Sequence, residues 1–352
     1  MARIRVLVVE DSFTVRRYLV EVLAADPEIE VVGEAADGKR AIELCAQLRP
    51  DVITLDMMLP LMTGLAATEY IMAHFPTPIL IVSASTNRGE LFRTYDALRA
   101  GAVDVLDKAG TNEPPGVWER RFVQTVKLVS RIRVITHLRA RIETHRARTS
   151  GRAPPRVREC FALAIGASTG GPGAVVEVLR EIPPTFDIPV LVVQHIGETF
   201  AQGMADWLDG QTSHRVAWAT DGTPLAAIRP GEVVIAPAGR HLILRSGKLR
   251  LSDGAERNYC RPSVDVLFES LAQELGSASA GCLLTGMGRD GAAGLLQIRR
   301  AGGLTVAQDE ATSVVFGMPR EAVALGAAER VLPLNEIGPT LSTLIRPRRN
   351  AT

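Results

Sequence analysis

The sequence predicts an α/β protein made of two domains in one chain. Short apolar runs alternate with amphipathic helical patterns in both halves, which is the pattern of parallel sheets covered by helices. The length of 352 residues also exceeds what a single hydrophobic core usually organises. We therefore expect two doubly wound sheets, one in each half.

The first half contains five strand–helix repeats. Its strands are continuous apolar runs, as is typical of a sheet buried on both faces. A fifth helix begins near Trp118, so we expect this domain to span residues 1–124. The expected strands are residues 4–9, 29–34, 52–55, 79–82 and 103–106, and the helices between them are 13–25, 39–48, 65–74 and 90–100.

A basic segment follows the first domain. Apolar residues recur every three or four positions from Phe122 to Ile142, which predicts that the fifth helix continues. Arginines dominate its other faces, and a glycine and a pair of prolines then break the pattern. We interpret residues 125–158 as a basic helical linker, whose charge fits either a solvated helix face or an acidic partner surface.

The second half, residues 159–346, alternates again and adds a hairpin. Residues 246–248 form a turn between two short strands, so a mostly parallel, doubly wound sheet is expected to carry one antiparallel hairpin. The expected strands are 161–166, 189–195, 215–219, 232–236, 241–245, 249–251, 280–285 and 304–307, and the helices are 173–181, 199–209, 264–275 and 291–301.

Composition and charge argue against several classes of function. The net charge of +1 gives no sign of a nucleic-acid or membrane-surface partner. No apolar stretch approaches the roughly 20 residues that cross a bilayer, and the N-terminus looks like a strand rather than a signal peptide. We expect a cytoplasmic protein without membrane insertion. The four cysteines are widely spaced, which fits reduced thiols and not a metal site: Cys45, Cys160, Cys260 and Cys282.

Polar residues stand at the ends of four strands of the first domain. Glu10 and Asp11 follow the first strand and Asp56 the third, and the carboxyl ends of parallel strands share one edge. Repulsion among three carboxylates favours a bound cation, and oxygen ligands suit Mg²⁺. A carboxylate beside Mg²⁺ can accept a phosphoryl group. Ser83 and Lys108, at the next two strand ends, would then contact the phosphoryl oxygens.

This arrangement resembles the receiver domain of bacterial response regulators, over residues 3 to about 123. The resemblance implies a flavodoxin-like fold, Asp56 as phospho-acceptor, Mg²⁺ held by Glu10, Asp11 and Asp56, and a sensor histidine kinase as phosphoryl donor. Helix capping by Asp11 or Ser12 would explain only part of the pattern. The chain departs from the family's usual residues, including its switch residues, at Leu59, Thr63, Val105 and Ala109.

In the second half, Ser168 stands on a glycine-rich turn between a strand and a helix. The stretch FALAIGASTGGPG surrounds it with small residues that permit a sharp bend and close approach of a substrate. Pro172 suits the first turn of the helix, whose N-terminus could stabilise an oxyanion. The string fits the nucleophile pattern G-x-S-x-G, although such a loop could also cradle phosphate.

A histidine and an aspartate are expected at the same sheet edge as Ser168. His195 ends an apolar strand, and Asp290 lies in a glycine-rich turn after the strand 280–285. A carboxylate there could hold the imidazole tautomer, or could only cap the following helix. The chain order serine, histidine, aspartate is not that of an α/β-hydrolase.

Six motifs then give the second half a specific resemblance: GASTGG, VVQH, VVIAPAGRHL, RPSVDVLF, LLTGMGRDGA and SVVFGMPREA. They resemble the catalytic domain of the chemotaxis receptor methylesterase family, the CheB-type protein-glutamate methylesterase/glutaminases. The resemblance implies no cofactor for ester hydrolysis. Residues 261–265 mark the family, and we claim no catalytic role for them. It implies a catalytic triad of Ser168, His195 and Asp290, with Thr169 and Met287 beside the reacting carbonyl.

We therefore expect a phosphorylation-regulated serine esterase of chemotaxis. It would demethylate glutamate methyl esters on the cytoplasmic helices of a methyl-accepting chemoreceptor, and the same chemistry would deamidate glutamine. One alternative is a phospho-switch that only binds receptor or signalling proteins, against which the triad argues. The other is a DNA-binding regulator, but the second half has no helix-turn-helix pattern.

Overall fold

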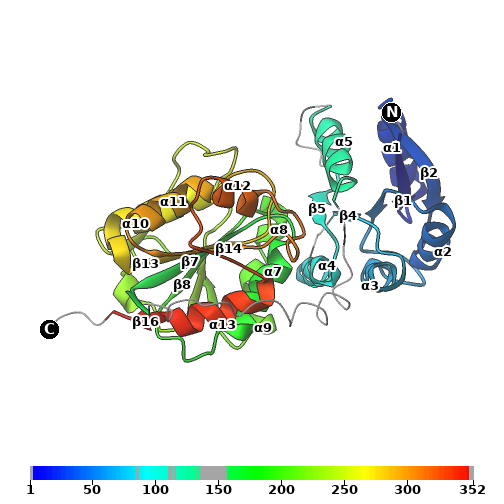
Figure 1. The fold of residues 1–352 in the computed structure, drawn as a ribbon. Helices are drawn as coiled ribbons and strands as arrows, with labels where there is room; N and C mark the ends of the chain where they lie inside the picture. The colour runs from blue at the N-terminus through cyan, green and yellow to red at the C-terminus, as the bar shows by residue number, and fades with distance from the viewer. Residues whose placement is uncertain are drawn as a thin grey trace. The chain divides into compact units, whose positions relative to one another are not determined.

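The structure is a computed structural model that describes residues 3–84, 87–109, 114, 116–132, 134 and 157–348. The chain divides into two compact units, residues 1–150 and 151–352, and each is described by itself (Figure 1). The predicted fold class is confirmed: each unit holds a parallel sheet between two layers of helices, and the second unit adds an antiparallel hairpin.

The first unit is a five-stranded parallel sheet in the order β2-β1-β3-β4-β5. Helices α1 and α5 cover one face, and α2, α3 and α4 the other (Figure 1). The strands are β1 (Ile4–Val9), β2 (Ile29–Ala35), β3 (Val52–Leu55), β4 (Ile79–Ser83) and β5 (Asp104–Asp107); the helices are α1 (Phe13–Ala24), α2 (Gly38–Leu48), α3 (Gly64–His74), α4 (Arg88–Ala100) and α5 (Val117–Val129).

Side-chain caps fix where four of these helices begin. Ser12, Asp37, Thr63 and Asn87 each accept a hydrogen bond from the backbone N–H three residues later, which satisfies one of the unpaired amides of the first turn. Thr63, which departs from the receiver pattern, therefore has a local structural role as the N-cap of α3.

The fifth helix is shorter than predicted. It ends at Val129, and the amides of Arg131 and Ile132 bond three residues back, as in a terminal turn. Although the apolar pattern continues, helix α5 does not extend to Ile132. Most of the predicted linker, including the stripe from residue 135 to 142, lies outside the described residues.

The second unit is a seven-stranded parallel sheet in the order β15-β14-β13-β7-β8-β10-β9. The hairpin β11–β12 turns through Ser246 and Gly247, both with positive φ, as a two-residue hairpin turn requires. The strands are β6 (Arg158–Cys160), β7 (Ala162–Ala167), β8 (Val190–Gln194), β9 (Val216–Trp218), β10 (Val233–Ile235), β11 (His241–Arg245), β12 (Lys248–Ser252), β13 (Ser279–Leu283), β14 (Leu304–Gln308), β15 (Arg330–Leu332) and β16 (Ile345–Pro347), with β6 and β16 forming a separate pair.

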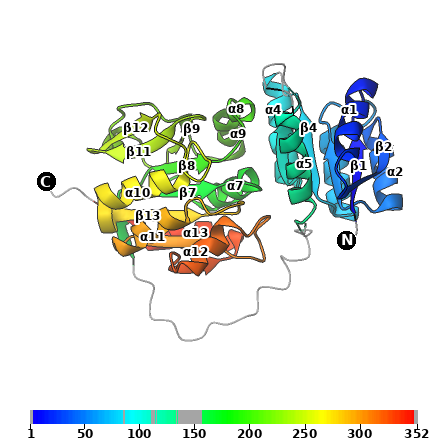
Figure 2. The ribbon, with the colours of Figure 1, turned by 90° about the horizontal axis from the view of Figure 1, so that it is seen from above.

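Helices α10, α11 and α12 cover one face of this sheet, and α7, α9 and α13 the other (Figures 1 and 2). The core lies between sheet and helices, where Leu267, Phe268 and Leu271 of α10 are completely buried. The helices are α7 (Gly171–Glu181), α8 (Glu198–Ala201), α9 (Met204–Gln211), α10 (Val264–Leu275), α11 (Ala292–Arg300), α12 (Met318–Ala324) and α13 (Leu334–Leu344).

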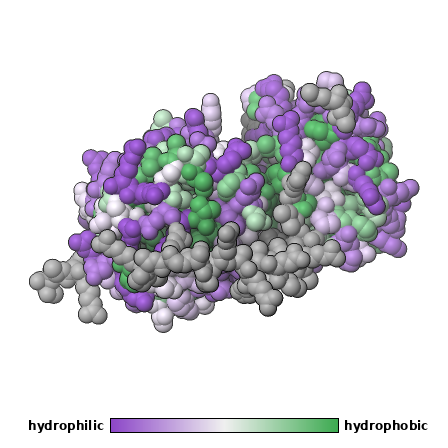
Figure 3. Space-filling view, in the orientation of Figure 1, coloured by the Kyte–Doolittle hydropathy of each residue, from purple (hydrophilic) through white to green (hydrophobic). Residues whose placement is uncertain are grey.

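Several details of the second unit differ from the prediction. The helix expected at 199–209 is two helices, α8 and α9, with Gly203 at the N-cap of α9. Helices α12 and α13 and strands β6, β15 and β16 were not predicted: α12 has only seven residues, each of the strands has three, and α13 contains Pro339. On the face drawn in Figure 3, hydrophilic and hydrophobic residues are interspersed. Among the described residues, no helix is both long and apolar enough to cross a membrane.

Candidate active site and acceptor site

Ser168 follows β7 on a tight turn at the carboxyl edge of the second sheet. Its N–H donates to the carbonyl of Thr285 (3.0 Å), and its carbonyl accepts from Gly171 (2.7 Å), the first residue of α7. Gly170 has a φ of 74°, and a Cβ there would also collide with Val314. The turn thus directs the chain from strand to helix within a few residues of Ser168.

His195 comes next to Ser168 because β8 pairs with β7. Its N–H donates to the carbonyl of Ala167 (2.9 Å), so the strand pairing continues past the end of β8. Its ring Nε2 lies 2.9 Å from Oδ2 of Asp290, and its Nδ1 lies 3.7 Å from the Sγ of Cys260. The predicted histidine–aspartate pair therefore exists, and Nδ1 is the ring nitrogen that remains for a nucleophile.

The pair carries an unusual charge balance. Burial favours the neutral imidazole, but the hydrogen bond to Asp290 and the nearby Cys260 thiol outweigh it and raise the pKa of His195 to about 9. Burial also opposes ionisation of Asp290, yet its bonds to His195, Ser263 and Asn258 hold the pKa of that carboxyl at about 2. At neutral pH the two groups form an ion pair.

Asp290 is held by the beginning of α10 as well as by the imidazole. Its carboxylate is 2% exposed and faces the N-terminus of the helix, where backbone amides and the helix dipole favour negative charge. A carboxylate with so many donors has one fixed orientation. The donors besides His195 are Ser263 Oγ (2.7 Å), Val264 N (2.7 Å), Asn258 Nδ2 (3.0 Å) and Asp265 N (3.3 Å).

The other predicted neighbours of the reacting carbonyl also come to this edge. Thr169 is buried, and its carbonyl accepts a hydrogen bond from the hydroxyl of Thr285 (3.0 Å). Met287 is half-buried and follows Gly286, which packs against Ser168. In the described part of the chain, no hydrogen bond joins the Ser168 hydroxyl to the imidazole. The structure therefore brings Ser168, His195 and Asp290 to one sheet edge, and a hydrogen bond joins only His195 and Asp290.

In the first unit, the predicted acidic cluster lies at the carboxyl ends of β1 and β3. Glu10 and Asp56 are almost fully buried, and Lys108 Nζ lies 2.8 Å from a carboxylate oxygen of each. Asp11 is exposed, but its carboxylate comes within 4.8 Å of the other two. Three carboxylates at this spacing fit a hard divalent cation such as Mg²⁺.

Burial and charge act in opposite directions at this cluster. Burial and the negative charge of Asp56 raise the pKa of Glu10 despite its contact with Lys108. Burial works against the ammonium of Lys108, but its bonds to Asp56 and Glu10 raise its pKa overall. The hydroxyl of Ser83 is buried without a hydrogen-bond partner among the described residues, so it is available to a phosphoryl oxygen.

Both halves of the chain match known protein families. Residues 163–341 match the family model of the CheB methylesterase, and residues 6–113 match that of the response regulator receiver domain. A protein-glutamate methylesterase/protein-glutamine glutaminase of Anaeromyxobacter dehalogenans is 46% identical over 343 residues, which are 97% of each chain. The chain belongs to the CheB methylesterase family.

Further members of this family are also similar to the chain. A protein-glutamate methylesterase/protein-glutamine glutaminase of Nitrosospira multiformis is 40% identical over 98% of each chain. The crystal structure of the Thermotoga maritima CheB methylesterase catalytic domain matches with a TM-score of 0.50 and 36% identity, covering 53% of this chain and 99% of that one. The family resemblance expected from the motifs is therefore confirmed.

Two structural residues of this CheB-family site were missed in the sequence. Gln194 reads as the last polar residue of a strand, but its side-chain Nε2 donates to the carbonyls of both Ser168 and His195 (2.8 Å each). Asn258 lies in a loop without helical or strand periodicity, and its contacts with Asp290 depend on the folded chain. The stretch 261–265 contributes the Asp290 donors Ser263, Val264 and Asp265, and a serine before an apolar helix was the signal for such a cap.

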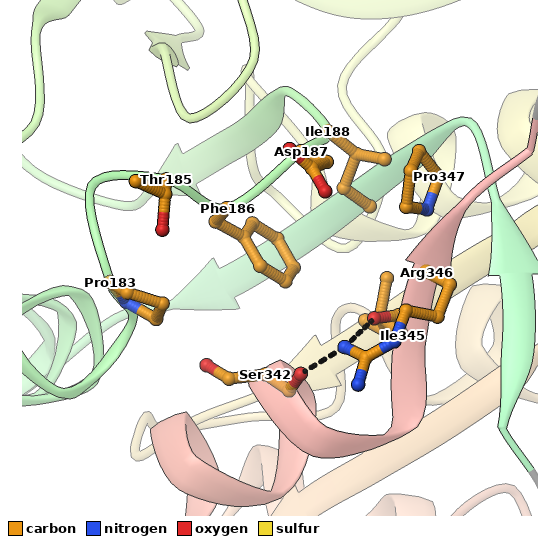
Figure 4. A pocket seen from close by; sticks show the side chains of 9 residues that line it. All are labelled: Pro183, Thr185, Phe186, Asp187, Ile188, Ser342, Ile345, Arg346 and Pro347. Carbon is orange, nitrogen blue, oxygen red and sulfur yellow. Dashed lines mark hydrogen bonds between the residues drawn. The ribbon is translucent and has the colours of Figure 1, made fainter.

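A cavity of about 220 Å³ in the second unit lies away from these residues (Figure 4). It is formed by residues 183–188, which precede β8, and by the chain end around Arg346, whose guanidinium donates to the carbonyl of Ser342. His195 follows β8, so the cavity and the imidazole lie at opposite ends of the same strand. The residues predicted to be catalytic in this CheB-family chain lie at the carboxyl edge of the sheet and do not line that cavity.

Proposed function

We propose that this protein is a phosphorylation-regulated serine esterase that removes methyl groups from glutamate γ-methyl esters of a chemoreceptor. The observation that carries the proposal is the 2.9 Å pair between His195 Nε2 and Asp290 Oδ2, at the sheet edge where Ser168 stands. The names of the relatives, protein-glutamate methylesterase/protein-glutamine glutaminase, support the same activity.

The mechanism follows from Nδ1, the nitrogen of the imidazole that does not contact Asp290. Asp290 occupies Nε2, so Nδ1 of His195 takes the proton of Ser168 as its hydroxyl attacks the ester carbonyl. The tetrahedral oxyanion forms near the N-terminus of α7, with Thr169 and Met287 beside it. His195 then protonates the leaving methanol, and the glutamyl group remains on Ser168 as an acyl-serine.

Water completes the cycle. His195 takes a proton from water, which attacks the acyl-serine and releases glutamate and the free hydroxyl. The same steps on a glutamine amide would release ammonia in place of methanol. Neither reaction requires a cofactor, since the serine, the imidazole and the carboxylate supply nucleophile, base and orientation.

In the first unit, we assign Asp56 as the phospho-acceptor. Mg²⁺, held by Glu10, Asp11 and Asp56, would neutralise the charge of the acceptor and of the incoming phosphoryl group. Lys108 would contact one phosphoryl oxygen, because its ammonium lies 2.8 Å from Asp56. Ser83 would contact another, because its buried hydroxyl has no hydrogen-bond partner among the described residues. The phosphoryl donor would be a sensor histidine kinase, and the protein would act in the cytoplasm on the cytoplasmic helices of its receptor.

We divide the chain into a receiver domain of residues 1–124, a basic helical linker of residues 125–158 and a methylesterase domain of residues 159–346.

Methanol release from a methylated receptor fragment tests the proposal. Ser168→Ala should abolish turnover while its thermal unfolding matches the parent protein, and His195→Ala should cost nearly as much because the residues act as a unit. Ser277→Ala, at an exposed serine of the same unit, is the matched control. Substantial turnover by Ser168→Ala would show that the wrong nucleophile was chosen, and normal receptor binding without any turnover by the parent would favour a non-catalytic switch.

A further inference from the structure

A two-residue turn next to the catalytic pair carries an exposed tyrosine. Arg257 and Cys260 exchange two backbone hydrogen bonds (3.1 and 2.9 Å), so Asn258 and Tyr259 alone form the loop between them. Their φ angles are 53° and 62°. Such turns usually have asparagine followed by glycine, because L side chains other than asparagine rarely adopt this backbone region. A tyrosine therefore stands where glycine would be less strained.

Both neighbours of this tyrosine are fixed to the active site. The side-chain nitrogen of Asn258 donates to the carboxylates of Asp265 (2.9 Å) and Asp290 (3.0 Å), and its side-chain oxygen Oδ1 accepts from Arg289. Cys260 Sγ lies 3.7 Å from Nδ1 of His195. Since one neighbour contacts the catalytic carboxylate and the other the imidazole, Tyr259 must lie at the rim of the site.

The exposure of Tyr259 sets it apart from the other tyrosines. It is 98% exposed, whereas Tyr18 and Tyr70 are 36% and 41% exposed and Tyr95 is buried. Tyrosine offers a large contact area and few torsions to immobilise, and it is enriched among the residues that dominate protein interfaces. An exposed ring adds no packing that would offset the strain of the backbone beneath it. This combination points to contact between the ring and a partner.

We propose that Tyr259 is a docking residue for the protein substrate, which packs an apolar strip next to its esterified glutamate against the ring. This inference rests on the proposed esterase function and adds a recognition contact outside the reacting groups. A contact equally strong in the bound and transition states lowers KM without changing kcat. The turn between Arg257 and Cys260 would thus align the substrate and the imidazole through one rigid element.

The test uses the full chain with Ser168→Ala, so that affinity is measured without turnover. The probe is the fluorescently labelled cytoplasmic fragment of a methylated receptor, followed by anisotropy. Tyr259→Ala and Tyr259→Gly should raise Kd about tenfold, as expected for truncation of a central aromatic contact, and Tyr259→Phe should stay within about twofold. Tyr70→Ala in the first unit is the matched aromatic control.

Tyr259→Gly separates docking from a structural role. Relief of the positive φ should leave its thermal midpoint equal to or above that of the parent, while its affinity falls. In proteins with Ser168 intact, the same change should raise KM about tenfold with kcat within about twofold. Parent-like affinity of Tyr259→Gly would overturn the inference. Absence of methanol release by the parent would instead count against the esterase function, because the binding measurement needs no turnover.

Discussion

Gly286 packs so closely against Ser168 that a Cβ built on Gly286 would lie 2.7 Å from the Cβ of Ser168. The same Cβ would also meet the sulfur of Met318. Gly286 is the residue before Met287 in the glycine-rich turn after β13, and its amide and carbonyl bond to Val315 and Met318. The turn that carries Asp290 therefore also sets the position of Ser168.

Gly286→Ala should displace Ser168 and reduce methanol release by at least about tenfold. Overpacking of a buried site costs about 1–3 kcal/mol, so the thermal midpoint should also fall by several degrees. Gly210→Ala in α9 is the matched control, since a Cβ there meets nothing within 4 Å and alanine favours a helix by about 0.5–1 kcal/mol. Full activity of Gly286→Ala would show that Ser168 tolerates displacement.

Gln194 links Ser168 to His195 through two 2.8 Å bonds from one side-chain nitrogen to their carbonyls. Gln194→Ala removes a shared donor from two partly buried carbonyls, which should cost about 1 kcal/mol of stability and lower kcat more than it raises KM. Gln194→Glu should be worse, because a carboxylate cannot donate to either carbonyl. Urea unfolding and turnover kinetics check both variants, with exposed Gln297→Ala as control. Loss of stability with kcat unchanged would limit Gln194 to a structural role.

The pH dependence of activity should follow the imidazole. The pKa of His195 is raised to about 9, so the free protein holds an imidazolium at pH 7, and a general base must first lose that proton. kcat/KM should therefore rise with pH between about 7 and 9, and level off above the pKa. Cys260→Ala removes a contact that raises this pKa and should move the rising limb to lower pH. A rate that falls over that range would contradict the assignment of His195 as base.

Selective alkylation should identify the thiol beside the imidazole. Cys260 is half-buried, whereas Cys45, Cys160 and Cys282 are at most 1% exposed. Iodoacetamide should modify Cys260 first, and the added group should obstruct Nδ1 of His195, 3.7 Å from the sulfur, and reduce turnover. Peptide mass mapping gives the site, and Cys260→Ala should keep whatever activity it has under the same treatment. Equal labelling of all four cysteines would contradict the burial on which this prediction depends.

Strand ends were the part of the site that the sequence could predict. Ser168, His195 and Asp290 each follow a continuous apolar run, and such runs pair in parallel with their carboxyl ends at one edge. Gln194 and Asn258 could not be found in this way. Their roles depend on where each side chain points once the sheet and α10 have assembled. Gln194 bonds to Ser168, 26 residues away, and Asn258 bonds to Asp290, 32 residues away, and contacts at such distances leave no periodic signal in the sequence.

In the first unit, too, local sequence patterns predicted the strands and helices but not where the last helix ends. Apolar periodicity predicted its strands and four helices to within about two residues, but it predicted that α5 would continue beyond Val129. Apolar spacing identifies a face that can be buried and does not fix where the helix ends. Val105 and Ala109 remain departures from the receiver pattern, whereas the contacts of Lys108 with Asp56 and Glu10 follow from strand order alone.

Phosphorylation of Asp56 should raise esterase activity. It would add a doubly charged group that draws on Lys108, now shared between Asp56 and Glu10, and on the unpartnered hydroxyl of Ser83. A rearrangement worth about 1.4 kcal/mol would change the balance between an inactive and an active form about tenfold. Acetyl phosphate with Mg²⁺ should thus activate the parent protein about tenfold or more, Asp56→Asn not at all, and Ser83→Ala less than the parent.

A fragment that starts at residue 154 distinguishes two ways in which the first unit could act. If the unphosphorylated receiver restrains the esterase, the fragment should turn over faster than the unphosphorylated whole protein and should ignore acetyl phosphate. If phosphorylation supplies an activating contact, the fragment should stay at the low rate of the unphosphorylated protein. Methanol release from one receptor preparation compares all forms. Equal rates for fragment, whole protein and phosphorylated protein would show that the receiver does not control the esterase, and activation of Asp56→Asn would move the acceptor to another residue.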